Sequence, residues 1–421
     1  MIMSKIKNRY LLGILIALVY FLTDRALNEC VLFSLLFGSV DMGYKVSGWA
    51  SFAVWIAFAV WAGCKKFRLD WKKLSPLFFI AGYFLCLLFS TRLNGLGFYR
   101  LLTIILNTMS VLLFIVMACE KEENAKLFVS SVSWLYLVFT ALNAFSILFR
   151  GVWGVLHAEQ AECFIGNFDT SGFAVELGMF YALLDAHLNS DRKNSKYKLW
   201  AFIGFFLLDV FAVFRTSGTT VIAAFLIAMY LFVPFVRKWA EKTDLLVFAG
   251  LSVLMFVVLT WLWQPIMNLA PIKVFLQDVL QKDLSMSGRT DQFPRIFSDY
   301  ILKKPLFGYG IDTNSFLTLD NIFWAGSFHE QVLLYHTNNQ ILQTLYDGGI
   351  LALSVIATLV VYTSRVLKSF KDKRLAGIVK WMLFVIMIAY NGDILPSYNW
   401  TFAFEIIMLA SAIGETNENR R

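Results

Sequence analysis

Apolar runs of about 17–25 residues recur along the whole chain, and each is long enough to cross the hydrocarbon layer of a bilayer as a helix. Hydrophobic residues make up 58% of the 421 residues, and a soluble fold would have to expose much of that surface. The sequence therefore predicts an all-α, polytopic integral membrane protein with about 12 transmembrane helices in a single membrane domain, residues 1–421. We expect the spans at residues 10–23, 47–63, 74–90, 99–118, 127–149, 169–188, 199–214, 219–236, 244–263, 350–366, 376–390 and 398–414.

Residues 26–40 form a further apolar stretch that is shorter than the predicted spans. It could be a re-entrant piece, an extension of the first span, or a thirteenth crossing. A true crossing would invert every later connection and place the basic clusters outside, against the usual distribution of charge. We therefore reject the crossing and leave the other two alternatives open.

Lysine and arginine residues gather in alternate short connections between the predicted spans. Such residues are enriched in cytoplasmic loops, so both termini are predicted to be cytoplasmic and residues 264–338, between the ninth and tenth spans, to lie outside. The net charge of +8 is thus a topology signal, and its dispersal over several loops argues against a nucleic-acid partner. The basic positions are Lys5, Lys7, Arg9, Lys65, Lys66, Arg68, Lys72, Lys73, Arg192, Lys193, Lys196, Lys198, Arg237, Lys238, Arg365, Lys368, Lys371, Lys373, Arg374, Arg420 and Arg421.

The outer segment has helical periodicity of its own. Apolar residues at helical spacing predict amphipathic helices over residues 271–284 and 290–304. A third helix is predicted to begin after His336, with Thr337 or Asn338 as N-cap, and to break at residues 348–349 (Gly-Gly).

Two residues of this segment are candidates for handling an anion. Arg289 lies beside a predicted helix start, where a guanidinium and free backbone N–H groups suit a phosphate or diphosphate. His336 lies at another helix start, where the positive end of the dipole disfavours imidazolium and favours a neutral ring. The alternatives are a solvated loop arginine and an interfacial histidine.

Further cations are predicted on the outer face. Arg215 ends the span 199–214, where an arginine near lipid is costly unless it is paired or solvated. Asp209 is its nearest acidic candidate, and a structural salt bridge is the alternative to a catalytic role. Arg100 could line the same cavity or could simply mark the membrane interface.

Several familiar motifs fail on spacing. His329-Glu330 and His336 are seven residues apart, not the four that place two zinc ligands on one helical face, and the outer face has no compact carboxylate pair, so no metal or cofactor is expected. The glycines 308 and 310 (Gly-Tyr-Gly) lack the third glycine of a dinucleotide site. The five cysteines show no paired spacing, although a bridge between Cys30 and Cys163 is left open.

Taken together, the short polar motifs resemble those of the O-antigen polymerase and ligase superfamily. Their order and their placement on the predicted outer face carry the resemblance, which extends over the topology of the whole chain. At residues 214–218 (Phe-Arg-Thr-Ser-Gly) the serine that usually precedes the family's arginine is absent. The other matching stretches are 166–173 (Gly-Asn-Phe-Asp-Thr-Ser-Gly-Phe), 287–289 (Ser-Gly-Arg), 305–310 (Pro-Leu-Phe-Gly-Tyr-Gly), 336–339 (His-Thr-Asn-Asn) and 347–350 (Asp-Gly-Gly-Ile).

This resemblance implies a metal-independent membrane glycosyltransferase that acts on undecaprenyl-diphosphate-linked oligosaccharides at the outer face of a bacterial cytoplasmic membrane. Arg289 and Arg215 would stabilise the charge that grows on the leaving diphosphate. His336 would take the proton of the acceptor hydroxyl or hold that sugar in line for attack. The residues expected to bind the diphosphate or sugar are Arg100, Asn167, Tyr309, Asn338 and Asn339.

Three activities remain open at this point. We favour a polymerase of capsular polysaccharide or exopolysaccharide repeat units, because the composition, rich in lysine and phenylalanine, and the motifs resemble polymerases of low-GC Gram-positive bacteria. A ligase would transfer the glycan to another acceptor, and a flippase would move the lipid-linked sugar. A transporter predicts charges deep in many spans and repeated halves, whereas this sequence shows only a few such charges (Glu176, Asp209 and Glu405) and no internal repeat. The expected partners are the lipid-linked oligosaccharide, membrane lipid, a flippase and a chain-length regulator.

Overall fold

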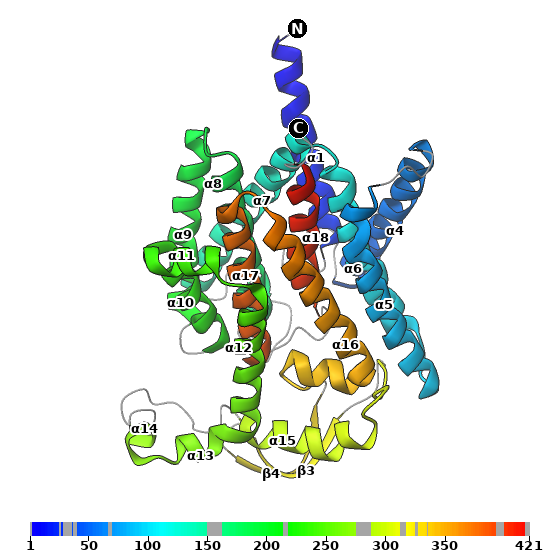
Figure 1. Ribbon diagram of the computed structural model, residues 1–421, viewed down its shortest axis with the longest axis vertical. Coiled ribbons are helices and arrows are strands. Elements are labelled where there is room, and N and C mark those ends of the chain that lie inside the picture. The colour runs from blue at the N-terminus through cyan, green and yellow to red at the C-terminus, as the bar shows by residue number, and fades with distance from the viewer. Residues whose placement is uncertain are drawn as a thin grey trace.

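In the computed structural model, long helices form a bundle with a smaller helix-and-hairpin unit at one end (Figure 1). The structure describes residues 2–24, 27, 36, 40–65, 70–149, 162–213, 218–274, 288–311, 317–324, 327–334, 336–392 and 400–416. The helices that make up the bundle are α1 (Ile2–Thr23), α4 (Val40–Cys64), α5 (Trp71–Leu93), α6 (Tyr99–Ala118), α7 (Glu122–Leu148), α8 (Phe168–Leu188), α9 (Lys193–Val213), α10 (Gly218–Phe232), α11 (Pro234–Lys242), α12 (Leu245–Val257), α16 (Gln340–Ser369), α17 (Lys373–Gly392) and α18 (Thr401–Thr416).

The membrane class predicted from the sequence is confirmed. Seven of the described helices are long and apolar enough to cross a membrane, or eight if the bent pair of α10 and α11 counts as one span. The larger predicted number of spans is not confirmed. Most of the ambiguous stretch 26–40, and Cys30 with it, lies outside the described residues, whereas Cys64, Cys86 and Cys119 are free thiols.

One predicted span, residues 219–236, is broken. Helix α10 ends at Phe232, Val233 is extended, and α11 begins at Pro234, so the two helix axes differ by 96°. Proline clashes with a helical conformation of the residue before it and removes a backbone donor. The predicted span at residues 219–236 is therefore a bent pair of helices, which is either a broken span or a re-entrant loop.

The smaller unit contains α13 (Trp263–Met267), α14 (Ala270–Val274), α15 (Arg289–Asp299) and an antiparallel hairpin of β3 (Leu317–Trp324) and β4 (Ser327–Leu334). The predicted helix 290–304 is confirmed as α15 and the 3₁₀ turn Ile301–Lys303.

Most of the predicted helix 271–284 lies outside the described residues, and the hairpin was not predicted. In β3, Leu317 and Leu319 are buried whereas Asp320 is exposed, and that period of two is a strand pattern. A second, shorter pair of antiparallel strands, β1 (Glu162–Cys163) and β2 (Gly166–Asn167), precedes α8.

Helix α16 changes direction at Gly349, where the predicted break is confirmed: this residue has φ 65° inside an otherwise helical segment. A Cβ atom on Gly349 would lie 2.2 Å from the carbonyl oxygen of Leu306, so no other residue fits. The backbone N–H groups of Tyr309 and Gly310 donate to the carbonyls of Tyr346 and Asp347, at 2.6 and 2.9 Å. The motifs 305–310 and 347–350 therefore build one tight junction between the loop and the kinked helix.

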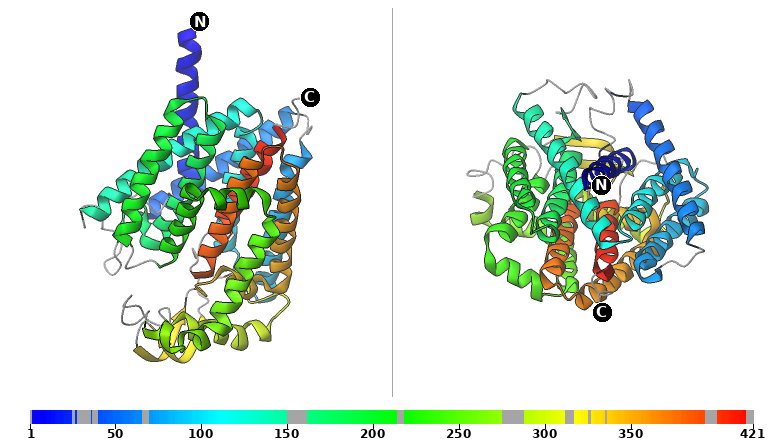
Figure 2. Two further views of the ribbon diagram at one scale, coloured as in Figure 1. Left: turned by 60° about the vertical axis from the view of Figure 1, so that its left-hand side comes forward. Right: turned by 90° about the horizontal axis from the view of Figure 1, so that it is seen from above.

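Both termini lie at the end of the bundle away from the hairpin unit (Figure 2, left). The predicted orientation, with this unit outside, is tested by cysteine labelling. We expect a single cysteine at exposed Asp320 in β3, in a background without native cysteines, to react with a membrane-impermeant thiol reagent in intact cells. A cysteine at exposed Lys371, at the opposite end, should react only after permeabilisation. The reverse pattern would invert the topology.

Candidate functional site

The beginning of α15 explains the Ser-Gly-Arg motif. Gly288 is the N-cap with φ 84°, a left-handed conformation that glycine adopts without strain. Arg289 is the first residue of α15, so its guanidinium belongs to the positive end of that helix. The motif therefore determines the position of Arg289, one of the cations of the site.

His336 lies in the turn before α16, and two arginines act on it. Burial lowers the pKa of its imidazole from 6.5 to about 4, and the positive charges of Arg289 and Arg100 act in the same direction. Arg100 is the second residue of α6, so residues from the starts of three helices meet here. The structure thus places three of the predicted site residues within electrostatic range of one another, and burial together with the two arginines favours the neutral ring.

The backbone around His336 selects its tautomer. The N–H of Asn338 donates to Nδ1 of His336 at 3.4 Å. A backbone N–H can only donate, so Nδ1 carries the lone pair and the neutral ring carries its proton on Nε2. Nε2 is therefore a hydrogen-bond donor, which suits an anionic or sugar oxygen.

Asn339 begins α16, and this corrects the predicted N-cap. Its Oδ1 accepts from the N–H groups of Ile341 and Leu342, at 2.9 and 3.1 Å, so the cap is neither Thr337 nor Asn338. Its Nδ2 donates to the carbonyl of Asn391 in α17 at 3.0 Å. The amide of Asn339 is therefore engaged by the protein, and its predicted role in binding substrate stays a prediction.

A chain of buried polar groups supports the turn that contains His336. The N–H of Thr337 donates to Gln343 Oε1 at 2.9 Å, and Gln343 Nε2 donates to Asp347 Oδ1 at 2.8 Å. Arg100 also acts electrostatically on Asp347. Buried polar groups joined in this way hold one geometry, so His336 is positioned by the first turns of α16.

Gln292 is a site residue that sequence analysis missed. It lies one turn after Arg289 on α15, is fully buried, and accepts from Asn338 Nδ2 at 3.5 Å. Its own Nε2 is buried and has no hydrogen-bond partner among the described residues. A buried amide donor left unsatisfied is costly, so it offers a further hydrogen bond to a substrate oxygen. The spacing of three residues from Arg289, on one helical face, is the signal that could have revealed it.

Tyr309 belongs to an aromatic cluster. Its ring stacks on Tyr346 with centroids 4.9 Å apart and packs edge-on against Tyr300, and Lys304 Nζ lies 4.5 Å from its centroid. These contacts support the junction beneath the site. Its predicted contact with a sugar stays a prediction.

The remaining predicted residues cannot be placed in the site. Asn167 is the last residue of β2, opposite Glu162, and its side chain is outside the description. Arg215 lies outside the described residues, whereas its predicted partner Asp209 is buried in α9. Within the described ranges no group of three or more His, Cys, Asp or Glu side chains could hold a metal ion; the metal-free mechanism stays a prediction.

The titration of His336 gives a direct test of this geometry. Because its pKa is about 4 in the folded protein and 6.5 is the ordinary value, the unfolded chain binds more protons between these pH values. The unfolding free energy should therefore decrease as pH falls from 6.5 toward 4. We expect NMR of labelled histidine to show His336 neutral at pH 5, and Arg289→Gln to raise its pKa. An ordinary titration near 6.5 in the wild type would contradict the site.

Fold and site together define a helical membrane protein with a half-buried, cationic polar site at one end of its bundle. Residues 204–357 match a family model described as O-antigen ligase, and the match supports membership of the O-antigen ligase and polymerase superfamily. Curated proteins give no significant match to this chain. The matched segment contains Arg289, Gln292 and His336, while Arg100 comes from outside it. The family indicates glycan transfer at a membrane, with a lipid-linked oligosaccharide as the general kind of partner.

Proposed function

We propose that this protein polymerises undecaprenyl-diphosphate-linked repeat units into a capsular polysaccharide or exopolysaccharide at the outer face of the cytoplasmic membrane. The observation that carries the proposal is the convergence of Arg289 and Arg100 on a neutral His336. Two cations beside an uncharged donor suit a diphosphate next to a sugar hydroxyl. Arginine is favoured for this purpose because its planar fork binds two phosphate oxygens at once.

In the proposed reaction, an acceptor hydroxyl oxygen attacks the anomeric carbon of a lipid-linked glycan. The bond from that carbon to the diphosphate oxygen breaks, and its electron pair stays on the departing undecaprenyl diphosphate. The proton of the acceptor hydroxyl passes to an oxygen of that diphosphate. Arg289 and Arg100 would stabilise this growing charge. The Nε2–H of His336 and the amide of Gln292 would donate to substrate oxygens and hold the two sugars in line.

Substrate binding would also change the histidine. A diphosphate between the two arginines would offset their positive field, so the pKa of His336 should rise from about 4 when the lipid binds. A hydrogen bond from Nε2–H to the charged diphosphate would also be stronger than one to a neutral oxygen. The arginines and the histidine would thus act as one anion-binding unit.

A ligase is the second candidate, because the matching family model is described by that activity. Purified protein reconstituted with undecaprenyl-diphosphate repeat units separates the alternatives. A ladder of multiples of the repeat unit is the expected result. Transfer to a different added acceptor without a ladder would identify a ligase, and the absence of any new glycosidic bond would leave a transporter.

A further inference from the structure

A cavity lies far from this site, between α1, α7 and α9 near the end that holds both termini (Figure 1). Its volume is about 750 Å³, within the range of roughly 300–1,000 Å³ that is typical of small-molecule sites. It is open at the side of the bundle. A ligand could therefore enter from the surrounding membrane.

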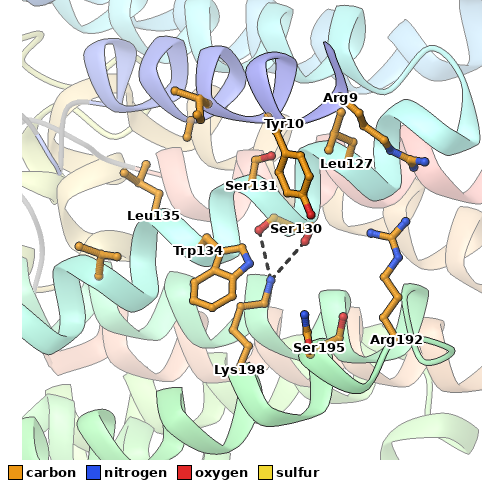
Figure 3. A pocket seen from close by; sticks show the side chains of 15 residues that line it. Arg9, Tyr10, Leu127, Ser130, Ser131, Trp134, Leu135, Arg192, Ser195 and Lys198 are labelled. Carbon is orange, nitrogen blue, oxygen red and sulfur yellow. Dashed lines mark hydrogen bonds between the residues drawn. The ribbon is translucent and has the colours of Figure 1, made fainter. Parts of the chain in front are cut away.

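Three cations and no carboxylate line this groove. Arg9, Arg192 and Lys198 point toward the same space (Figure 3). The charge of Lys198 is already compensated, because its Nζ lies 2.7 Å from a carboxylate oxygen of buried Asp185 and donates to the carbonyl of Ser130 at 3.2 Å. Arg9 and Arg192 form no ion pair with any residue that the structure describes. Two like charges facing one space favour an anion between them.

The rest of the groove is apolar. Trp134 and Leu135 lie on the side away from the arginines (Figure 3). Ile14 on α1 and Val138 on α7 continue that wall and are 66% and 51% exposed. A free phosphate would use only the cationic end, whereas an anionic headgroup with an acyl chain would cover both ends.

We propose that this groove is a binding site for an anionic glycerophospholipid. The phosphate lies between the guanidinium groups of Arg9 and Arg192, where the hydroxyls of Tyr10 and Ser195 face the same space (Figure 3). One acyl chain follows Trp134 and Val138 along α7. This inference is independent of the glycan chemistry at the other end.

Native mass spectrometry of the purified protein, with phosphatidylglycerol and phosphatidylethanolamine supplied together, tests the proposal. We expect the wild type to retain phosphatidylglycerol selectively. A juxtamembrane arginine contributes about fivefold to the binding of an anionic lipid, so the double variant Arg9→Gln/Arg192→Gln should retain it about 25-fold less. The matched control Lys121→Ala/Arg365→Ala removes two exposed cations outside the groove and should retain it as the wild type does.

Each other result overturns the proposal. Equal retention by the double variant and the control would show that the arginines do not bind the lipid. Equal retention of both lipids by the wild type would remove the recognition of charge. Complete displacement by soluble glycerol phosphate would show that the apolar wall binds no acyl chain. The double variant Arg9→Lys/Arg192→Lys keeps both charges. We expect it to retain more phosphatidylglycerol than the double Gln variant and less than the wild type. Retention below that of the double Gln variant would contradict the charge argument.

Discussion

Replacing His336 by alanine should reduce glycan polymerisation about 10²–10³-fold, the usual cost of removing a donor that stabilises developing charge. His336→Gln should retain at least about ten times more activity than His336→Ala, because a glutamine amide can donate near the position of Nε2 but cannot act as a base. The measurement is the rate of ladder formation from lipid-linked repeat units by purified variants.

His329 provides the control for this histidine. It lies in β4 opposite Ile322, away from the turn before α16, and His329→Ala should leave the rate nearly unchanged. Equal loss in the Gln and Ala variants of His336 would contradict the donor role and favour proton abstraction by the ring. Equal tolerance of changes at both histidines would leave His336 with packing alone.

The sequence predicted the membrane architecture because lipid imposes a simple rule. Each crossing segment must be apolar and must pair its own backbone groups, and α5, α6 and α17 follow that rule closely. The failures lie where a local feature overrides the average. Pro234 turns the chain by 96° near the end of an apolar run. The alternation that creates β3 extends over too few residues to stand out beside helical segments.

The site was predictable in outline for a different reason. Gly288 and Asn339 fix helix starts, and such starts can be read from the identity of single residues. The polar chain from Thr337 through Gln343 to Asp347 runs from the turn before α16 into that helix. Nothing in the types of these residues distinguishes the chain from an ordinary exposed helical face. The role of Arg100 depends on how near the start of α6 lies to His336 in the folded chain, and no local sequence pattern encodes that arrangement.

Arg289→Lys should be nearly as damaging as Arg289→Ala, with a loss of about 10²–10³ in rate. Lysine keeps the charge but loses the planar fork that binds two phosphate oxygens. The single ammonium group of a lysine at the start of α15 therefore cannot replace the guanidinium. Arg100→Ala should also slow the reaction. If this cation acts on the leaving diphosphate, the variant should lose more in the rate of the chemical step than in the binding of the lipid-linked substrate.

Arg295 is the matched control because it lies on the same helix and is already engaged. Its Nε lies 3.1 Å from Asp291 Oδ1, and its guanidinium donates to the carbonyl of Asp320 at 2.8 Å. Arg295→Ala therefore removes an arginine from α15 without touching the site, and its cost should appear in thermal stability and not in rate. Wild-type rates in Arg289→Ala would refute the anion-binding role. Full activity in Arg289→Lys together with loss in Arg289→Ala would show that charge alone matters, and that the diphosphate is not held at two oxygens.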